Sequence, residues 1–239
     1  MSSGYIVALI IIILICIHEY TYSKNKYVFN SSKIGPTIGF IGGVHGNEIS
    51  GAITLQSMVD SGYFAKITNG RVKVIPVANP SGFKLNSRYT STFTDLNRIY
   101  KTPITDKTAL EITQFFSDCD IVIDFHEGWS WNRINSNSLG STITPSFPMP
   151  LANDIVTALN NSPTMKAVIS KDPRKQFDVG KDSIVCEIPS TMECYMRKNG
   201  RPHILVEIPG QNSGHPLNIR LNNIHVVVDL VLKKYGCIL

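Results

Sequence analysis

Short apolar segments alternate with segments of helical periodicity along this chain, and this alternation constrains its fold more than any other feature. Two of the apolar segments, Val72–Ala78 and Ile121–Phe125, are apolar at nearly every position, as expected for strands covered on both faces. The other predicted strands include Pro36–Gly43 and His203–Ile208. The predicted helices are Ile49–Val59, Lys107–Phe116, Leu151–Leu159 and Leu217–Tyr235. We therefore predict an α/β fold, a three-layer sandwich with a mostly parallel or mixed central sheet and helices on both faces.

The N-terminus carries an unbroken apolar run of 13 residues, Tyr5–Ile17. As a helix it would span roughly 20 Å, whereas the hydrocarbon core of a membrane is about 30 Å thick. Its density in isoleucine and its terminal position favour a signal anchor. A cleaved signal peptide is the alternative, although no basic residue precedes the run and no small-x-small site follows it.

These features predict three regions. Residues 1–19 form a signal anchor or signal peptide, residues 20–33 a polar linker, and residues 34–239 one domain. We expect the protein to associate with a membrane through residues 5–17, or to be secreted if the segment is cleaved.

Composition excludes two other classes of protein. The chain is 43% hydrophobic and 17% charged, which is too apolar for a disordered protein of 239 residues. The net charge of +5 is spread along the chain without a long basic block interleaved with aromatic residues, so nucleic acid is not an expected partner.

The segment His45-Gly46-Asn47-Glu48 places an imidazole and a carboxylate three residues apart, where a Gly-rich loop enters a predicted helix. Zinc accepts both groups, and a catalytic zinc site uses three protein ligands and leaves one position open. His126, at the end of the strand Ile121–Phe125, supplies a candidate third ligand. In α/β sheets, functional side chains gather where strands end. The sequence therefore predicts one zinc ion held by His45, Glu48 and His126.

Several further motifs follow this segment in a fixed order. They are Asn79-Pro80-Ser81-Gly82, Arg88, Asp95-Leu96-Asn97-Arg98, Asp124-Phe125-His126 and Leu205-Val206-Glu207. With Gly42–Gly51, this order resembles the succinylglutamate desuccinylase and aspartoacylase family, within the zinc metallocarboxypeptidase superfamily. The resemblance extends from about Gly42 to the last helix and implies a zinc carboxypeptidase-like fold.

The resemblance also implies roles for individual residues. His45, Glu48 and His126 would be zinc ligands, and Arg88, Asn97 and Arg98 would bind the substrate. Glu207 would be the catalytic general base and acid. The chemistry agrees, because arginine binds carboxylates bidentately and a zinc hydrolase needs a carboxylate to move protons. The expected substrate is a small N-acyl amino acid or a peptide with a free carboxylate.

Two other glutamates lie near the motifs. Glu127 follows His126 directly, and neighbouring side chains on an extended strand point to opposite faces, so we expect Glu127 to face away from the metal. Glu187 shares the local sequence of Glu207, and the residues alone do not separate the two; the resemblance favours Glu207. The loop Gly128–Arg133 contains both tryptophans and is either a pocket wall or an ordinary packed loop.

The substrate class has an alternative. Only 32 residues follow Glu207, which leaves no room for the additional C-terminal β domain that narrows the cleft in aspartoacylase-type enzymes. A more open site would suit a zinc carboxypeptidase acting on peptides or cell-wall fragments. A zinc-binding module without catalysis is disfavoured, because ligands, carboxylate-binding residues and base are all present.

Overall fold

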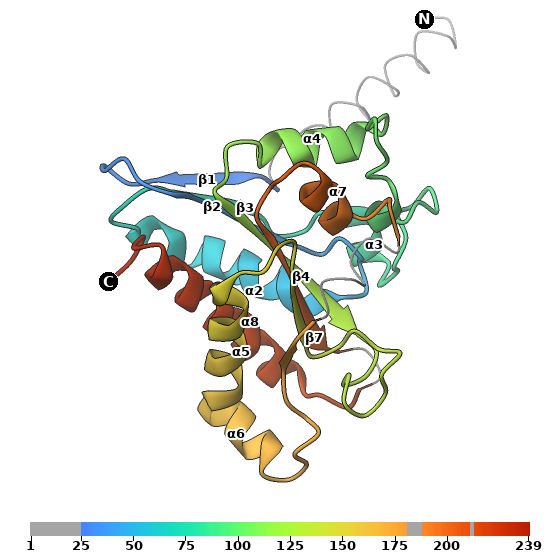
Figure 1. Ribbon diagram of the computed structural model, residues 1–239. Coiled ribbons are helices and arrows are strands. Elements are labelled where there is room, and N and C mark those ends of the chain that lie inside the picture. Colours follow the sequence, from blue (N-terminus) through green and yellow to red (C-terminus); the bar gives the residue numbers. More distant parts are fainter. Residues whose placement is uncertain (1–24, 181–187, 211–212) are drawn as a thin grey trace, which may run out of the picture.

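The computed structural model describes residues 25–180, 188–210 and 213–239 (Figure 1). Within these residues the chain forms a seven-stranded mixed sheet with the order β1-β3-β2-β4-β7-β5-β6. The strands are β1 Tyr27–Asn30, β2 Thr37–Gly42, β3 Arg71–Ile75, β4 Ile121–Gly128, β5 Thr142–Pro145, β6 Asp178–Val179 and β7 His203–Pro209. Strands β3, β2, β4 and β7 run parallel, while β1 and β5 pair antiparallel to β3 and β7.

Helices cover both faces of this sheet, which confirms the predicted three-layer sandwich (Figure 1). The α-helices are α2 Ile49–Asp60, α3 Pro80–Lys84, α4 Lys107–Phe115, α5 Pro150–Asn161, α6 Pro163–Ile169, α7 Met192–Lys198 and α8 Leu217–Lys234. Two 3₁₀ turns are η1 Tyr63–Lys66 and η2 Leu96–Arg98. Helices α2, α5 and α8 pack on one face with the larger core, and α4 and α7 pack on the other with a smaller core.

Strand β4 shows how the sheet separates these two faces. All eight of its residues are buried, which explains its nearly continuous apolar sequence. Ile121, Ile123 and Phe125 belong to the larger core, whereas Val122 belongs to the smaller one. Because side chains alternate along a strand, Asp124 and His126 point to the same face as Val122, toward α4 and α7.

The predicted elements agree with the structure in type, and several boundaries move. β4 extends three residues beyond Phe125, so His126 lies inside the strand rather than after it. Glu207 likewise lies inside β7. The short elements β1, β5, β6, α3, α6 and α7 were not predicted individually, because segments this short carry little periodicity.

The predicted linker is wrong over part of its length. Residues 27–30 form β1, which pairs antiparallel with β3 through the register Tyr27↔Val74 to Asn30↔Arg71. The residues of β1 are half-buried and exposed in alternation, which is the pattern of an edge strand. The folded domain therefore begins before residue 34.

The apolar run Tyr5–Ile17 lies outside the described residues, so membrane association stays a prediction. Among the helices that the structure does describe, none has the length and hydrophobicity needed to cross a membrane.

Candidate metal-dependent active site

Two of the predicted ligands come from the loop between β2 and α2. Glu48 is the N-cap residue of α2, and its backbone N–H donates to the carbonyl oxygen of His45 at 3.1 Å, closing a tight turn. Gly46 lies within this turn, where a Cβ would stand 2.0 Å from the carbonyl carbon of Gly82. Only glycine allows the loop to pack this closely against α3, which explains the glycine between the two ligands.

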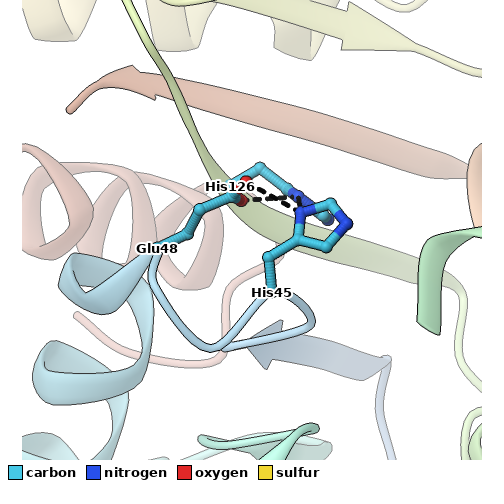
Figure 2. Close-up of side chains that lie close together, drawn as sticks. All are labelled: His45, Glu48 and His126. Carbon is cyan, nitrogen blue, oxygen red and sulfur yellow. Dashed lines mark hydrogen bonds and ion pairs between the residues drawn. The ribbon is translucent and has the colours of Figure 1, made fainter. Parts of the chain in front are cut away.

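The third predicted ligand, His126, reaches the same point from β4 (Figure 2). His45 Nδ1 lies 2.8 Å from Glu48 Oε1, His126 Nδ1 lies 2.8 Å from Glu48 Oε2, and the two Nδ1 atoms are 3.2 Å apart. All three side chains are buried. Each offers one ligand atom, and these three atoms lie close enough together to hold one metal ion.

Each imidazole has a carboxylate at its other nitrogen. His45 Nε2 lies 3.0 Å from Asp95 Oδ1, and His126 Nε2 lies 3.3 Å from Asp124 Oδ1. A proton held on Nε2 by such a carboxylate leaves the lone pair on Nδ1, which is the arrangement common to metal-binding histidines. With protons on both Nε2 atoms, the lone pairs of both Nδ1 atoms would be directed at the same point.

Charge in this cluster favours a cation. Burial raises the pKa of Glu48, but the imidazoles of His126 and His45 outweigh it and lower the pKa to about 2. Burial likewise opposes ionisation of Asp95 and Asp124, yet their neighbouring histidines, with Arg88 beside Asp95, hold both pKa values below the usual range. Two buried carboxylates, Glu48 and Asp124, and the half-buried Asp95 are thus kept ionised in a small volume.

The donor set fits zinc by its chemistry and by its spacing. Two imidazole nitrogens and a carboxylate oxygen are typical catalytic zinc ligands, and ligands placed tetrahedrally at about 2.0–2.1 Å from the ion lie roughly 3.3 Å from one another. The observed separations of 2.8–3.2 Å are close to that value. The residues present therefore fit the expected metal.

Glu207 lies beside the ligands because β4 and β7 are adjacent parallel strands. Their register pairs His126 with Glu207, so both side chains emerge from the same face of the sheet. Glu207 is 8% exposed and lines the cavity that contains the three ligand candidates. Burial, together with the carboxylates of Glu48 and Asp124, outweighs the histidines and raises the pKa of Glu207 to about 7.

The three predicted substrate-binding residues line the same cavity. Arg88 Nε donates to Asp95 Oδ2 at 3.0 Å, and its guanidinium also approaches His45 Nδ1 at 3.3 Å. Arg98 donates to the carbonyl oxygen of Asn97 at 2.7 Å. Asn97 Oδ1 accepts from the backbone N–H of Met192 at 3.0 Å, which leaves the amide nitrogen of Asn97 as a donor for a ligand.

The motif Asn79–Gly82 stabilises the loop that carries Arg88. Asn79 is the N-cap of α3, where its side chain accepts from Gly82 N at 2.8 Å. Its amide nitrogen donates to the carbonyl oxygen of Arg88 at 3.4 Å. This motif therefore shapes the loop that carries Arg88.

The cavity has a volume of about 490 Å³ and an apolar rim. Four rim side chains are 39–46% exposed: Trp129, Leu139, Val179 and Ile188. The two tryptophans of the loop Gly128–Arg133 differ, because Trp129 lines the cavity whereas Trp131 is buried against Phe177 and His215. Trp129 is thus part of the pocket wall, whereas Trp131 belongs to an ordinary packed loop.

The two rival glutamates have different outcomes. Glu127 faces away from the ligands as predicted, since its carboxylate accepts from Ser50 N at 2.7 Å and pairs with Arg220 at 2.7 Å. Ser50 and Arg220 belong to α2 and α8, which lie on the opposite face of the sheet from α7. Glu187 lies outside the described residues, so the comparison of Glu187 with Glu207 stays a prediction.

Sequence reasoning did not single out three residues of the site. Asp124 stands two positions before His126 on one strand, so alternation could have placed both on one face. Asp95 was assigned to the substrate motif, and its contact with His45 depends on a fold that brings residues 50 positions apart together. Glu193, a buried carboxylate on α7 that lines the cavity, had no sequence signal.

The chain is similar in sequence to one known protein family. Residues 34–214 match the succinylglutamate desuccinylase/aspartoacylase catalytic domain. The chain belongs to this family. The predicted family is confirmed. Comparison with curated protein sequences found no match.

Solved structures support the fold of the family. The cell shape determinant Csd4 from Helicobacter pylori superposes with a TM-score of 0.72 at 17% identity, covering 89% of this chain and 54% of Csd4. A succinylglutamate desuccinylase/aspartoacylase from Rhodobacter sphaeroides gives 0.61 at 19% identity, covering 90% and 58%. A putative metallopeptidase from Shewanella denitrificans gives 0.62 at 17% identity, covering 89% and 79%. The chain spans a little over half the length of the first two proteins.

Proposed function

We propose that this domain binds one zinc ion through His45, Glu48 and His126 and hydrolyses an amide bond next to a free carboxylate. The observation that carries the proposal is one cavity in which three ligand atoms converge beside a buried carboxylate, Glu207, on the neighbouring strand. Zinc in such a site makes water acidic enough to act as a nucleophile near neutral pH and polarises a carbonyl group.

Glu207 is the residue that moves protons. A general base works best when its pKa is close to the working pH, and burial brings the pKa of Glu207 to about 7. It can therefore accept a proton from the attacking water and then donate that proton to the leaving amine. Asp95 and Asp124, which lie 3.0 Å and 3.3 Å from the Nε2 atoms of His45 and His126, would favour the tautomer that suits binding through Nδ1.

The arginines have separate tasks in this proposal. Arg88 stands next to the ligand atoms, 3.5 Å from Glu48 Oε1, where negative charge would develop on the carbonyl oxygen during attack. Asn97 and Arg98 offer an amide donor and a guanidinium farther along the cavity, and these suit the free carboxylate of the substrate.

Two substrate classes fit this site. An N-acyl amino acid, as the family description suggests, is the first. A peptide is the second, favoured by the exposed apolar rim and by the similarity to Csd4, whose structures include a tripeptide-bound form and a form bound to mDAP described as a D,L-carboxypeptidase.

The metal is tested on the purified full chain. We expect close to one zinc per chain, and activity lost on chelation should return when zinc is added. A zinc content near zero in active wild-type protein would contradict the proposed site.

The substrate is tested with acetyl-aspartate, succinyl-glutamate and short peptides, each peptide paired with its C-terminal amide. Loss of a charge-assisted hydrogen bond to arginine costs about 1.5–3 kcal/mol, so the amides should react at least about tenfold more slowly. Equal turnover of a peptide and its amide would leave Asn97 and Arg98 without the proposed role.

A further inference from the structure

Glu193 is a buried carboxylate that the reaction above does not use. It lies in the first turn of α7, is 8% exposed and lines the same cavity as Glu207. Its Oε1 atom is buried and has no hydrogen-bond partner among the described residues. A buried oxygen without a partner is costly, so such a group calls for a ligand.

A role in capping α7 does not account for Glu193. Thr191 already caps this helix, because its Oγ1 accepts from the backbone N–H of Cys194 at 3.2 Å. The side chain of Glu193 is therefore available to the cavity.

The electrostatic surroundings of Glu193 favour a cation. Burial is the largest effect and, with the carboxylates of Asp124 and Glu207, it outweighs the opposing effects of His126 and Arg197 and raises the pKa of Glu193 to about 8. A neutral donor such as a hydroxyl would not favour the ionised form of Glu193, whereas a cation would. A protonated amine would satisfy the buried oxygen and reduce the repulsion at once.

The position of Glu193 in the chain points to a particular part of the substrate. The residue before it, Met192, donates its backbone N–H to Asn97 Oδ1 at 3.0 Å, and Tyr100 N donates to the carbonyl oxygen of Ser190 at 3.0 Å. These bonds fasten the start of α7 to the segment that carries Asn97 and Arg98. Donors for a carboxylate and an acceptor for an ammonium group thus stand on neighbouring segments of one cavity.

We propose that Glu193 is a specificity-determining residue that binds an ammonium group on the amino acid whose free carboxylate is held by Asn97 and Arg98. Preferred substrates then release an amino acid with a side-chain amine. This inference rests on the proposed function for the placement of the carboxylate.

The test compares lysine with norleucine, which has the same chain length and replaces the terminal aminomethyl group with a methyl group. Binding of each, in both enantiomers, is measured by calorimetry on the zinc-loaded full chain. Dipeptides that end in the same residues are then compared for kcat/KM. We expect the wild type to prefer lysine by about tenfold or more, the effect of one charge-assisted hydrogen bond.

Glu193→Gln keeps the shape and removes the charge. We expect it to reduce the lysine preference to about twofold or less while leaving norleucine binding unchanged. Asp60→Asn, which removes an exposed carboxylate at the end of α2, is the matched control and should keep the full preference. Should Glu193→Gln fail to fold, Glu193→Asp retains the charge and should keep a reduced preference for lysine.

The possible failures can be told apart. Equal binding of lysine and norleucine by the wild type, or a preference for lysine that survives in Glu193→Gln, would overturn the inference even if hydrolysis is observed. A lysine preference that depends on Glu193, without hydrolysis of any dipeptide or N-acyl amino acid, would support the inference and refute the proposed function instead.

Discussion

Two groups of carboxylates lie near the metal-ligand candidates, and they differ in the side chains that contact them. Around the ligand atoms, Glu48, Asp95 and Asp124 each contact a histidine, and their pKa values are lowered. Among the described residues, Glu207 and Glu193 have no hydrogen bond or ion pair with a histidine, and their pKa values rise to about 7 and 8. Burial acts on all five in the same direction, so the neighbouring histidines decide the sign of the shift.

This difference separates two kinds of chemistry on one face of one sheet. Carboxylates that stay ionised hold a cation and orient imidazoles, while carboxylates that protonate near neutral pH can exchange protons or receive an ammonium group. Variants that remove a histidine or neutralise one carboxylate test this division.

The largest effect is expected from His126→Ala. This variant removes a ligand candidate and leaves Glu48 and Asp124 without their shared imidazole. Zinc content and activity should fall to background, and the loss of one partner from a buried pair should cost about 3–5 kcal/mol of stability. Metal analysis and denaturant unfolding measure both effects. His225→Ala, an exposed histidine on α8, is the control; zinc loss there as well would refute the assignment.

Glu207→Gln tests the second group of carboxylates. Glutamine keeps the shape of the side chain but cannot accept the proton, so kcat should fall by about 10²–10⁴-fold while zinc content and stability stay near wild type. The matched variant is Glu187→Gln, whose local sequence resembles that of Glu207; it should retain kcat. The reverse pattern would move the catalytic role to Glu187.

Asp95→Asn should have a smaller effect on metal binding than His126→Ala. Asparagine can still contact His45 Nε2 but lacks the charge that orients the imidazole, so zinc affinity should fall about 10–100-fold. Competition with a chelator of known affinity measures this change. Asp106→Asn, which alters the N-cap of α4 far from the ligands, should leave zinc affinity unchanged. Unaltered affinity in Asp95→Asn would show that the contact with His45 is unimportant for binding.

The last prediction concerns the pH dependence of the stability of Glu193→Gln. The pKa of Glu193 is raised from 4.5 to about 8 in the folded state, so the folded state binds the extra proton and wild-type stability falls as pH rises through this window. Relative to wild type, the variant should gain at most about 1.4 kcal/mol per pH unit between these values and nothing below them. Denaturant unfolding at pH 4 and pH 9, with the metal content held constant, checks this. A constant difference between the two proteins would mean that Glu193 ionises normally.

The sequence by itself was sufficient for the parts of this protein that depend on local pattern. Alternating apolar runs and helical segments determined the sandwich, because burial on both faces leaves strands such as Ile121–Phe125 with almost no polar position. The close spacing of His45 and Glu48 indicated one convergent pair, since a single turn suffices to bring them together. The contrast between His126 and Glu127 also followed from the sequence, because alternation on a strand is a local property.

Only the tertiary structure decided which distant residues share a charge environment. The adjacency of His126 and Glu207 comes from the pairing of β4 with β7, whose order in the sheet no local periodicity encodes. The contact of Asp95 with His45, and the burial of Glu193 against the cavity, likewise require packing between segments far apart in the chain. The sequence identifies each aspartate and glutamate, but the pKa of its carboxylate is determined by the burial and the neighbouring charges that the fold provides.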